Sequence, residues 1–319
     1  MKSIIISLTL LLVDSLCGAQ TLKLYPVGSY VCLPVSDPAI ETEACWTDPD
    51  IRGVLLRAAW SNVEPTTGVY DWSYFDNGLQ LCQQYGKKAQ LCLIAGWRSP
   101  DWIYSLGSKP FALAGGKKTM PAPWDPVFEE NFKRMVTAFG ARYDSNQNVL
   151  SVTIWAGGKV VECFFATTPA DCAQLDAAGG CMIWATAAES FIDTYVAAFP
   201  TTQMFLTTGQ CYANDDSQTM TEVANYAIAK GLGLETDALA ENYPAATSRE
   251  FPHTHIDWKT IGVTNAQLVL SLSSPRMAGQ TAWQIAGNAL KCGFSAIQWY
   301  PTDPAQGSYG IRYFDQKAR

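Results

Sequence analysis

Short apolar runs rich in β-branched residues alternate along the chain with longer amphipathic segments. The short runs are typical of buried strands and the longer segments of surface helices, so the alternation predicts a parallel sheet covered by helices. The predicted strands are 30–34, 53–59, 88–95, 149–155, 203–208, 233–239, 268–273 and 295–300. The predicted helices are 74–85, 126–143, 187–199, 220–230 and 278–291.

Eight strands with intervening helices in about 300 residues have the size and rhythm of an α/β fold of the (β/α)₈ or TIM barrel type. The chain is 48% hydrophobic and only 16% charged, which is sufficient for a large core. No tether, charge block or internal repeat interrupts the pattern. We therefore expect a single barrel domain over residues 20–319.

The first 19 residues have the composition of a secretory signal peptide. Lys2 precedes an apolar core at 4–13, and the small residues at 17–19 form a cleavage site before Gln20. This core is too short to span a bilayer, and no later run approaches the ~20 residues required. A secreted, extracellular chain is therefore expected, with no membrane-spanning segment.

Nine cysteines remain after position 19, and an oxidising compartment favours disulfides between them. We expect at least two bridges that close loops at one end of the barrel: Cys32 with Cys45, and Cys163 with either Cys172 or Cys181. An odd count leaves one thiol free or bonded between chains, so self-assembly stays open. The cysteines expected to be buried and unpaired are Cys82, Cys92 and Cys292.

The stretch 148–165 runs as a buried strand and then delivers a carboxylate. Its apolar residues 149–155 end at the Gly157-Gly158 pair, and Glu162 follows. Catalytic groups of a parallel barrel lie where strands end, so Glu162 is a candidate catalytic residue. Its apolar neighbours predict a raised pKa. The alternative is a surface glutamate on a long loop.

Residues 53–102 contain an arginine at a strand end followed by the pattern W-S-x-x-E-P-x-x-G-x-Y-D-W. This pattern resembles the second and third strands of clan A glycoside hydrolases. The matching residues are Arg57, Trp60, Glu64, Pro65, Gly68, Tyr70, Asp71 and Trp72. We interpret Glu64 and Asp71 as turn and packing residues rather than catalytic ones.

Three further segments resemble the family 42, β-galactosidase-like branch of the clan: 123–126 (PWDP), 241–244 (ENYP) and 297–299 (IQW). The resemblance implies that Glu162 is the general acid/base and that Arg57 holds a carboxylate near the sugar-binding centre. It also implies that Trp299 forms the floor under the sugar ring, with Gln298 and Tyr243 in the same substrate-binding region.

The sequence departs from the clan at the seventh predicted strand, where a nucleophilic glutamate is expected. Residues 268–275 read LVLSLSSP and contain no acid. A glycosidase needs two carboxylates that flank the scissile bond. The candidates for the second are Glu235, Glu241 and Asp303. We favour Glu241, because it follows a strand directly and lies beside Tyr243, whose hydroxyl could orient it. The alternative, which the matching segment of the related proteins suggests, is that Glu241 binds a sugar hydroxyl.

Eleven tryptophans are many for a chain of this length. Aromatic faces stack on the C–H faces of sugars, so tryptophans at strand ends suit a carbohydrate cleft. We expect Trp97 and Trp299 in the cleft. Trp72, Trp184 and Trp283 are expected to be core packing residues.

Charge and motifs exclude several other functions. A net charge of −7 argues against nucleic acid and anionic membranes as partners, whereas a neutral carbohydrate fits. No zinc-site spacing, phosphate loop or serine elbow occurs, so no cofactor or metal is expected. His253 and His255 could bind a metal as a His-x-His pair, although two polar loop residues are the favoured interpretation.

Two functional hypotheses remain. The leading one is a secreted glycoside hydrolase that cleaves a β-linked glycoside with Glu162 as general acid/base. The alternative is a catalytically inactive barrel of the same type that binds glycans or serves as a structural extracellular subunit. The retention of Glu162, Arg57 and Trp299 favours the enzyme, and the missing acid on the seventh strand favours the alternative.

Overall fold

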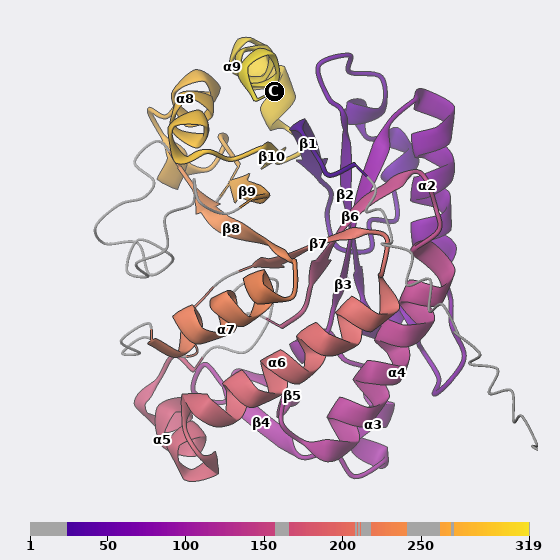
Figure 1. Ribbon diagram of the computed structural model, residues 1–319, viewed down its shortest axis with the longest axis vertical. Helices are drawn as coiled ribbons and strands as arrows, with labels where there is room; N and C mark the ends of the chain where they lie inside the picture. The colour runs from indigo at the N-terminus through magenta and orange to yellow at the C-terminus, as the bar shows by residue number, and fades with distance from the viewer. Residues whose placement is uncertain are drawn as a thin grey trace, which may run out of the picture.

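The computed structural model describes residues 24–156, 166–207, 209, 211, 218–240, 262–268 and 271–318. Within them eight parallel strands close into a barrel in the order β1-β10-β9-β8-β7-β6-β3-β2, with helices around it (Figure 1). The predicted (β/α)₈ barrel is confirmed. The barrel strands are β1 (Gly28–Cys32), β2 (Gly53–Ala59), β3 (Lys88–Ile94), β6 (Val149–Ile154), β7 (Gln203–Thr207), β8 (Gly233–Leu239), β9 (Thr264–Leu268) and β10 (Ala296–Trp299).

The seventh strand of the barrel lies earlier than the sequence pattern predicts. It is β9, Thr264–Leu268, rather than 268–273, and the residues from 271 onward form turns and the 3-10 helix η6 (Pro275–Met277). Buried Asn265 and half-buried Gln267 interrupt the apolar pattern of β9. The residues that follow are more apolar, and the strand was therefore predicted there. The corrected strand, TNAQL, also contains no Asp or Glu.

The helices connect successive strands and cover the barrel from outside (Figure 1). A helix that the sequence pattern did not predict, α9, ends the described chain, because its Pro304, Gly307 and Gly310 obscure the helical signal. No helix of the described part is both long and apolar enough to cross a membrane. The helices are α1 (Trp60–Val63), α2 (Ser73–Tyr85), α3 (Trp102–Ser105), α4 (Pro126–Tyr143), α5 (Pro169–Ala178), α6 (Cys181–Ala198), α7 (Gln218–Ala229), α8 (Ala282–Cys292) and α9 (Asp303–Lys317).

A small antiparallel hairpin interrupts the barrel pattern between β3 and α4. Its strands are β4 (Pro110–Leu113) and β5 (Lys118–Pro121). The chain then enters α4 through Asp125, whose carboxylate accepts a hydrogen bond from the backbone N–H of Phe128 at 3.1 Å. Pro126 occupies the first helical position, where the missing N–H costs nothing.

An aromatic cluster attaches α4 and α6 to the carboxyl ends of β2 and β6. The ring of Phe132 lies 5.4 Å from that of Trp60, 5.2 Å from that of Trp155 and 5.3 Å from that of Phe191, mostly edge to face. Edge-to-face pairs add to the stability gained from burial alone. The cluster therefore fixes the helical layer beside the strand ends at which a barrel carries its chemistry.

Glu64 and Asp71 have the packing and turn roles expected from the sequence. Glu64 is fully buried, accepts hydrogen bonds from Trp60 Nε1 at 2.8 Å and Gly68 N at 2.7 Å, and forms a 2.5 Å salt bridge with Arg134. Asp71 accepts from the backbone N–H of Ser73 at 2.9 Å, and hydrogen bonds from Ser73 lower the pKa of its carboxyl. Neither carboxylate faces the barrel interior.

The contact between α4 and α6 depends on a glycine. A Cβ atom at Gly140 would overlap the backbone carbonyl of Ala198 at the end of α6. We expect Gly140→Ala to lower the free energy of unfolding by about 1–3 kcal/mol, measured by urea denaturation. The matched control is Gly287→Ala in α8, where nothing lies within 4 Å of an added Cβ. That variant should gain about 0.5–1 kcal/mol, and equal effects at the two positions would contradict the packing argument.

Candidate functional site

Polar side chains from three adjacent strands face the barrel interior in two layers. In β9 and at the end of β10 the two polar residues are separated by one position, so they share one face. In β8 the register shifts between Thr236 and Leu239, and Asp237 is placed near Tyr300 by the effect of its charge on the Tyr300 pKa. The residues of the lower layer, nearer the strands' amino ends, are Glu235, Asn265 and Gln298, and those of the upper layer are Asp237, Gln267 and Tyr300. The lower layer is sealed, whereas all three upper residues are partly exposed.

Glu235 is the centre of the lower layer. Its side chain is buried, and both carboxyl oxygens accept hydrogen bonds from neighbouring strands. The donors are Thr207 Oγ1 at 3.1 Å, Thr153 Oγ1 at 3.2 Å, Asn265 Nδ2 at 2.5 Å and Gln298 Nε2 at 3.0 Å. Gln90 of β3 completes the layer by accepting from Gln298 Nε2 at 2.5 Å and Asn265 Nδ2 at 3.2 Å. The network therefore joins six of the eight strands.

Burial controls the protonation of Glu235. Loss of solvation raises the pKa of this carboxyl to about 7, although hydrogen bonds from Thr207, Thr153, Asn265 and Gln298 act in the opposite direction. The group consequently changes charge near neutral pH inside the barrel. Because it is sealed, it cannot reach a glycosidic bond, and it does not serve as the second catalytic carboxylate.

Arg57 and Tyr300 lie together in the accessible upper part of the barrel. Arg57 donates from Nε to the carbonyl of Leu33 at 3.0 Å. Burial and the nearby Cys32 thiol raise the pKa of Tyr300, while the Arg57 guanidinium lowers it. Gln267 connects Cys32 with Tyr300, since its Oε1 accepts from Cys32 Sγ at 3.5 Å and its Nε2 donates to the Tyr300 hydroxyl at 3.4 Å. A cation, a phenol and an amide thus converge at this level.

The structure separates the other predicted binding residues. Gln298 is fully buried and binds Glu235, so it lies below the accessible layer. Trp299 follows it on the strand and is also fully buried within the hydrophobic core. No part of its ring is exposed, so its burial does not support the predicted place under a sugar. Trp97 lies just after β3 in the 3-10 helix η3 (Gly96–Arg98) and is half-buried. The Lys118 ammonium stands 3.6 Å from the Trp97 ring centroid.

Asp303 has a structural role. Its carboxylate is fully buried and accepts from Ser271 Oγ at 2.7 Å, Leu272 N at 2.8 Å and Tyr300 N at 2.8 Å. These bonds tie the first turn of α9 to the chain that follows β9. Asp303 is therefore excluded as the second catalytic carboxylate on the same ground as Glu235.

The remaining predicted residues, Glu162, Glu241, Tyr243, His253 and His255, lie outside the described residues. In sequence, Glu162 follows β6, and Glu241 and Tyr243 follow β8. The carboxyl ends of parallel barrel strands lie at one end of the barrel, the end toward which the upper polar layer faces.

Sequence reasoning missed Asp237, Gln267 and Tyr300. Their signal was present, because each lies two positions beyond a residue of the lower layer. The prediction placed β9 too late along the chain, which hid Gln267, and it considered Glu235 without Asp237, the acid two positions after it. No group of three or more acidic, histidine or cysteine side chains among the described residues could hold a metal ion.

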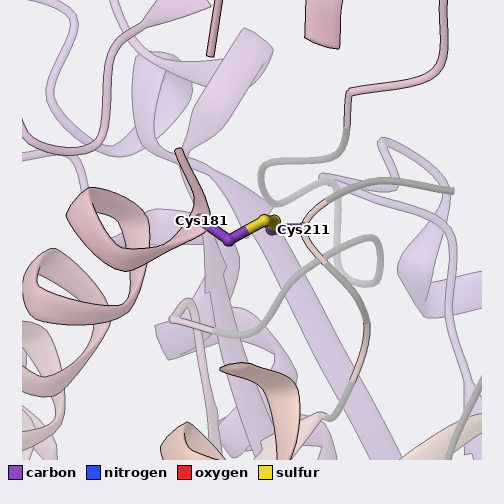
Figure 2. Close-up of a disulfide and its surroundings, with 2 residues drawn as sticks. All are labelled: Cys181 and Cys211. Atoms are coloured by element: carbon purple, nitrogen blue, oxygen red, sulfur yellow. A yellow bond between two sulfur atoms is a disulfide. The ribbon is translucent and has the colours of Figure 1, made fainter. Parts of the chain in front are cut away.

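One disulfide, Cys181–Cys211, joins the first residue of α6 to the chain beyond β7, with Cα atoms 6.0 Å apart (Figure 2). The carbonyl of Cys211 also accepts a hydrogen bond from Ala166 N at 2.9 Å. The bridge therefore anchors Cys211, to which Ala166 is hydrogen-bonded, and Ala166 is the first described residue after Glu162 in the sequence.

The predicted cysteine pairings are wrong. Cys32, Cys45 and Cys172 are free thiols, and Cys181 bonds Cys211, so neither proposed partner pairs with Cys163. The physical reason is orientation: Cys32 faces the barrel interior toward Gln267, whereas Cys45 lies in the 3-10 helix η2 (Ala44–Trp46), which packs on α2. Of the three cysteines that the sequence predicted to be buried, Cys82 is a buried free thiol, Cys92 is also buried, and Cys292 is half-buried.

Comparisons with known proteins support the resemblance to clan A glycoside hydrolases. A sequence model of glycoside hydrolase family 42, β-galactosidase, matches residues 53–168, which is less than half of the chain. The β-galactosidase BgaH of Haloferax lucentense is 25% identical over 100 residues, which cover 28% of this chain and 15% of that protein. The chain thus matches only a small part of this curated relative.

Solved structures share the fold at low sequence identity. The catalytic domain of a Paenibacillus polymyxa β-amylase superimposes with a TM-score of 0.67 and 11% identity, covering 93% of this chain and all of that one. A β-galactosidase from the psychrophilic Marinomonas ef1 gives 0.59 at 12% identity, covering 91% of this chain and 59% of that one. A psychrophilic family 10 endo-β-1,4-xylanase gives 0.53 at 15% identity, with 86% of each chain covered.

Removal of the disulfide should destabilise the protein. The bridge closes a loop between positions 30 residues apart, so we expect Cys211→Ser to lose about 2–4 kcal/mol of unfolding free energy in urea denaturation without reductant. Cys172→Ser, which removes a free thiol, is the control and should change little. Equal stabilities of wild type and Cys211→Ser would show that the bridge is unimportant.

Glu235 should make stability depend on pH near neutrality. Its folded-state pKa of about 7 lies above its ordinary value of 4.5, so stability is lost as pH rises through this interval. Glu235→Gln keeps the shape and never ionises. We expect the stability of wild type relative to this variant to fall by about 2.5 kcal/mol between pH 5 and pH 8. A stability difference between wild type and Glu235→Gln that stays flat over this range would contradict the raised pKa.

Proposed function

We propose that the protein is a glycoside hydrolase that cleaves a β-linked glycoside, with Glu162 as its general acid/base. The observation that carries this proposal is the match of the family 42 β-galactosidase model to residues 53–168, which include both Arg57 and Glu162. Relatives with this barrel carry the names β-galactosidase, xylanase and β-amylase. For the substrate of this chain, the proposal specifies a β-glycosidic bond and no particular sugar.

The chemistry follows from two carboxyl groups in opposite protonation states. Glu162, when protonated, donates its proton to the glycosidic oxygen as the bond to the anomeric carbon breaks. A second, ionised carboxylate either attacks that carbon or removes a proton from the attacking water. A separation of ~5 Å between the carboxyls supports retention of configuration, and one of about 6.5–9.5 Å supports inversion.

The second carboxylate is proposed to be Glu241. Glu235 and Asp303, the alternatives considered from the sequence, are both sealed by hydrogen bonds in the barrel. Asp237, partly exposed in the upper layer, is the described acid that competes with Glu241 for this role. Tyr243, two residues after Glu241, supplies a hydroxyl that could orient its carboxylate.

Arg57 is proposed to bind at the substrate centre. Its side chain is partly exposed beside Tyr300 and Cys32 at the carboxyl end of the barrel. A guanidinium at this place favours the ionised form of any carboxylate that approaches it. It therefore suits the neighbourhood of the second carboxylate better than that of the proton donor.

A non-hydrolytic barrel that binds glycans is the second candidate. The observation that favours it is the absence of an acid from β9, the strand on which the clan carries its nucleophile. The same mouth residues would then bind sugar without cleaving it.

We also propose that residues 1–19 direct export and that the mature chain begins at Gln20. The Cys181–Cys211 bond supports this proposal, since disulfides persist in oxidising compartments.

Turnover of aryl β-glycosides by the mature protein and by Glu162→Gln tests the main proposal. We expect the variant to lose about 10²–10⁴-fold in kcat on phenyl glycosides, which have poor leaving groups. The loss should be much smaller on 2,4-dinitrophenyl glycosides, whose leaving group needs no proton. A purely structural role of Glu162 would lower both rates equally.

Parallel variants Glu241→Gln and Asp237→Asn identify the second carboxylate, because its loss should abolish turnover of every substrate regardless of leaving group. Cys172→Ser serves as the control that keeps wild-type rates. Absence of turnover by the folded wild-type protein on α- and β-glycoside panels alike would remove the hydrolase and leave the glycan-binding function.

A further inference from the structure

Trp283 lies on the protein surface, contrary to the expectation that it packs in the core. Trp283 lies in the first turn of α8 and is 49% exposed, whereas Trp184 is buried and Trp72 packs against the core. The ring of Trp283 stands 5.9 Å from that of Tyr313 of α9, with an angle of 42° between the planes. Two aromatic rings therefore form one wall on the outer side of the barrel.

Close packing of α8 and α9 holds this aromatic pair in place. A Cβ at Gly310 would overlap the backbone of Ala282 and Trp283, and one at Gly307 would overlap the Ala282 side chain. The two glycines let α9 approach the first turn of α8, and Figure 1 shows the two helices side by side. The pair is thus positioned by backbone contact, so a ligand need not order it.

A hollow of about 530 Å³ opens beside the pair. Besides Trp283 and Tyr313 its walls include Gln284, Gly287, Asn288 and Lys291. The volume falls within the range of about 300–1,000 Å³ in which small-molecule sites lie. The hollow therefore has room for one or two sugar rings.

Gly287 is the floor of this hollow. It lies within α8 with ordinary helical backbone angles, and nothing stands within 4 Å of an added Cβ. Neither packing nor backbone geometry requires glycine here, although glycine is the poorest helix former after proline. Its effect is to leave open the space between Trp283 and Lys291, which a larger side chain would fill.

The chemistry of the walls selects a neutral, hydroxyl-rich ligand. Trp283 and Tyr313 offer aromatic faces for the C–H face of a sugar ring. Gln284, Asn288 and Lys291 line the same space, which would disfavour a purely apolar ligand. Gln284 Oε1 accepts from Thr281 and Asn288 Nδ2 donates to the Ala240 carbonyl, so both amides are held in position by the protein. The described walls contain no acid and a single cation, so neither a cationic nor a strongly anionic ligand is matched.

We propose that the hollow between α8 and α9 is a second carbohydrate-binding site, outside the barrel mouth, that holds one or two sugar units of a glycan chain by stacking on Trp283 and Tyr313. Because α8 follows β9, its first turn lies toward the end of the barrel that carries the mouth. The site goes beyond the proposed hydrolysis and does not depend on it.

Oxidation of Trp283 by N-bromosuccinimide, followed by peptide mass spectrometry, tests the site directly. The measurement uses the mature chain with soluble galactan, xylan and starch as probes. We expect at least one probe to slow oxidation of Trp283 about fivefold or more. Unchanged oxidation with all three probes overturns the proposal, whether or not the protein hydrolyses glycosides.

Gly287→Gln is the decisive variant, because it should fill the floor while keeping the helix stable. Its melting temperature should equal or exceed that of wild type, and protection of Trp283 should require at least tenfold more glycan. Leu106→Ala removes a 48% exposed apolar side chain elsewhere and should leave protection unchanged. If glycan protects Trp283 of Gly287→Gln from oxidation as fully as in wild type at the same concentrations, the proposed site is overturned. If Glu162→Gln loses turnover but glycan still protects its Trp283, the outer site is independent of the catalytic site at the barrel mouth.

Discussion

The enclosure of one carboxyl group, that of Glu235, constrains the whole interior of the barrel. A buried carboxyl without partners costs several kcal/mol, so the strands around it must supply polar groups. Four donors from β6, β7, β9 and β10 do so, and Gln90 of β3 binds two of them in turn. The register of these strands is thereby tied to a network that a shift of one residue would break.

This sealed layer also limits how far a ligand can enter the barrel. A ligand that enters from the carboxyl end of the strands meets Arg57, Gln267 and Tyr300, below which the Glu235 carboxyl is enclosed by hydrogen bonds from four strands. Reactive carboxylates must therefore come from above this level. Arg57 favours an ionised carboxylate near it, whereas the sequence around Glu162, with Val160, Val161 and Phe164, favours a protonated one. Under the proposed function, these two environments would suit the ionised and the protonated carboxyl that glycoside cleavage requires.

The sequence predicted the barrel well because the outward faces of the strands are apolar. The bounds of β2 and β8 agree with the prediction, and most others differ by one or two residues. The failure at β9 has a physical cause: Asn265 and Gln267 point into a polar interior, which removes the apolar signal on which the prediction rests. The short-range cysteine pairings failed because proximity in sequence says nothing about which face of the barrel a thiol occupies. Cys181 and Cys211 lie 30 residues apart, and the folded arrangement of α6 and β7 brings them together.

The position of Trp283 illustrates a different limit. Trp283 lies in an amphipathic helical segment, so pattern alone assigns its large apolar side chain to the core. Only the close approach of α9 reveals which side of α8 is covered. A carbohydrate site at Trp283 would be equally useful to a hydrolase and to a barrel that only binds glycans. In either case a chain held at α8 raises the local concentration of its other sugar units at the mouth, by an amount set by the length and stiffness of the glycan. Binding at the outer wall therefore cannot distinguish the two functions, and the distinction depends on whether a second carboxylate stands above the Glu235 layer.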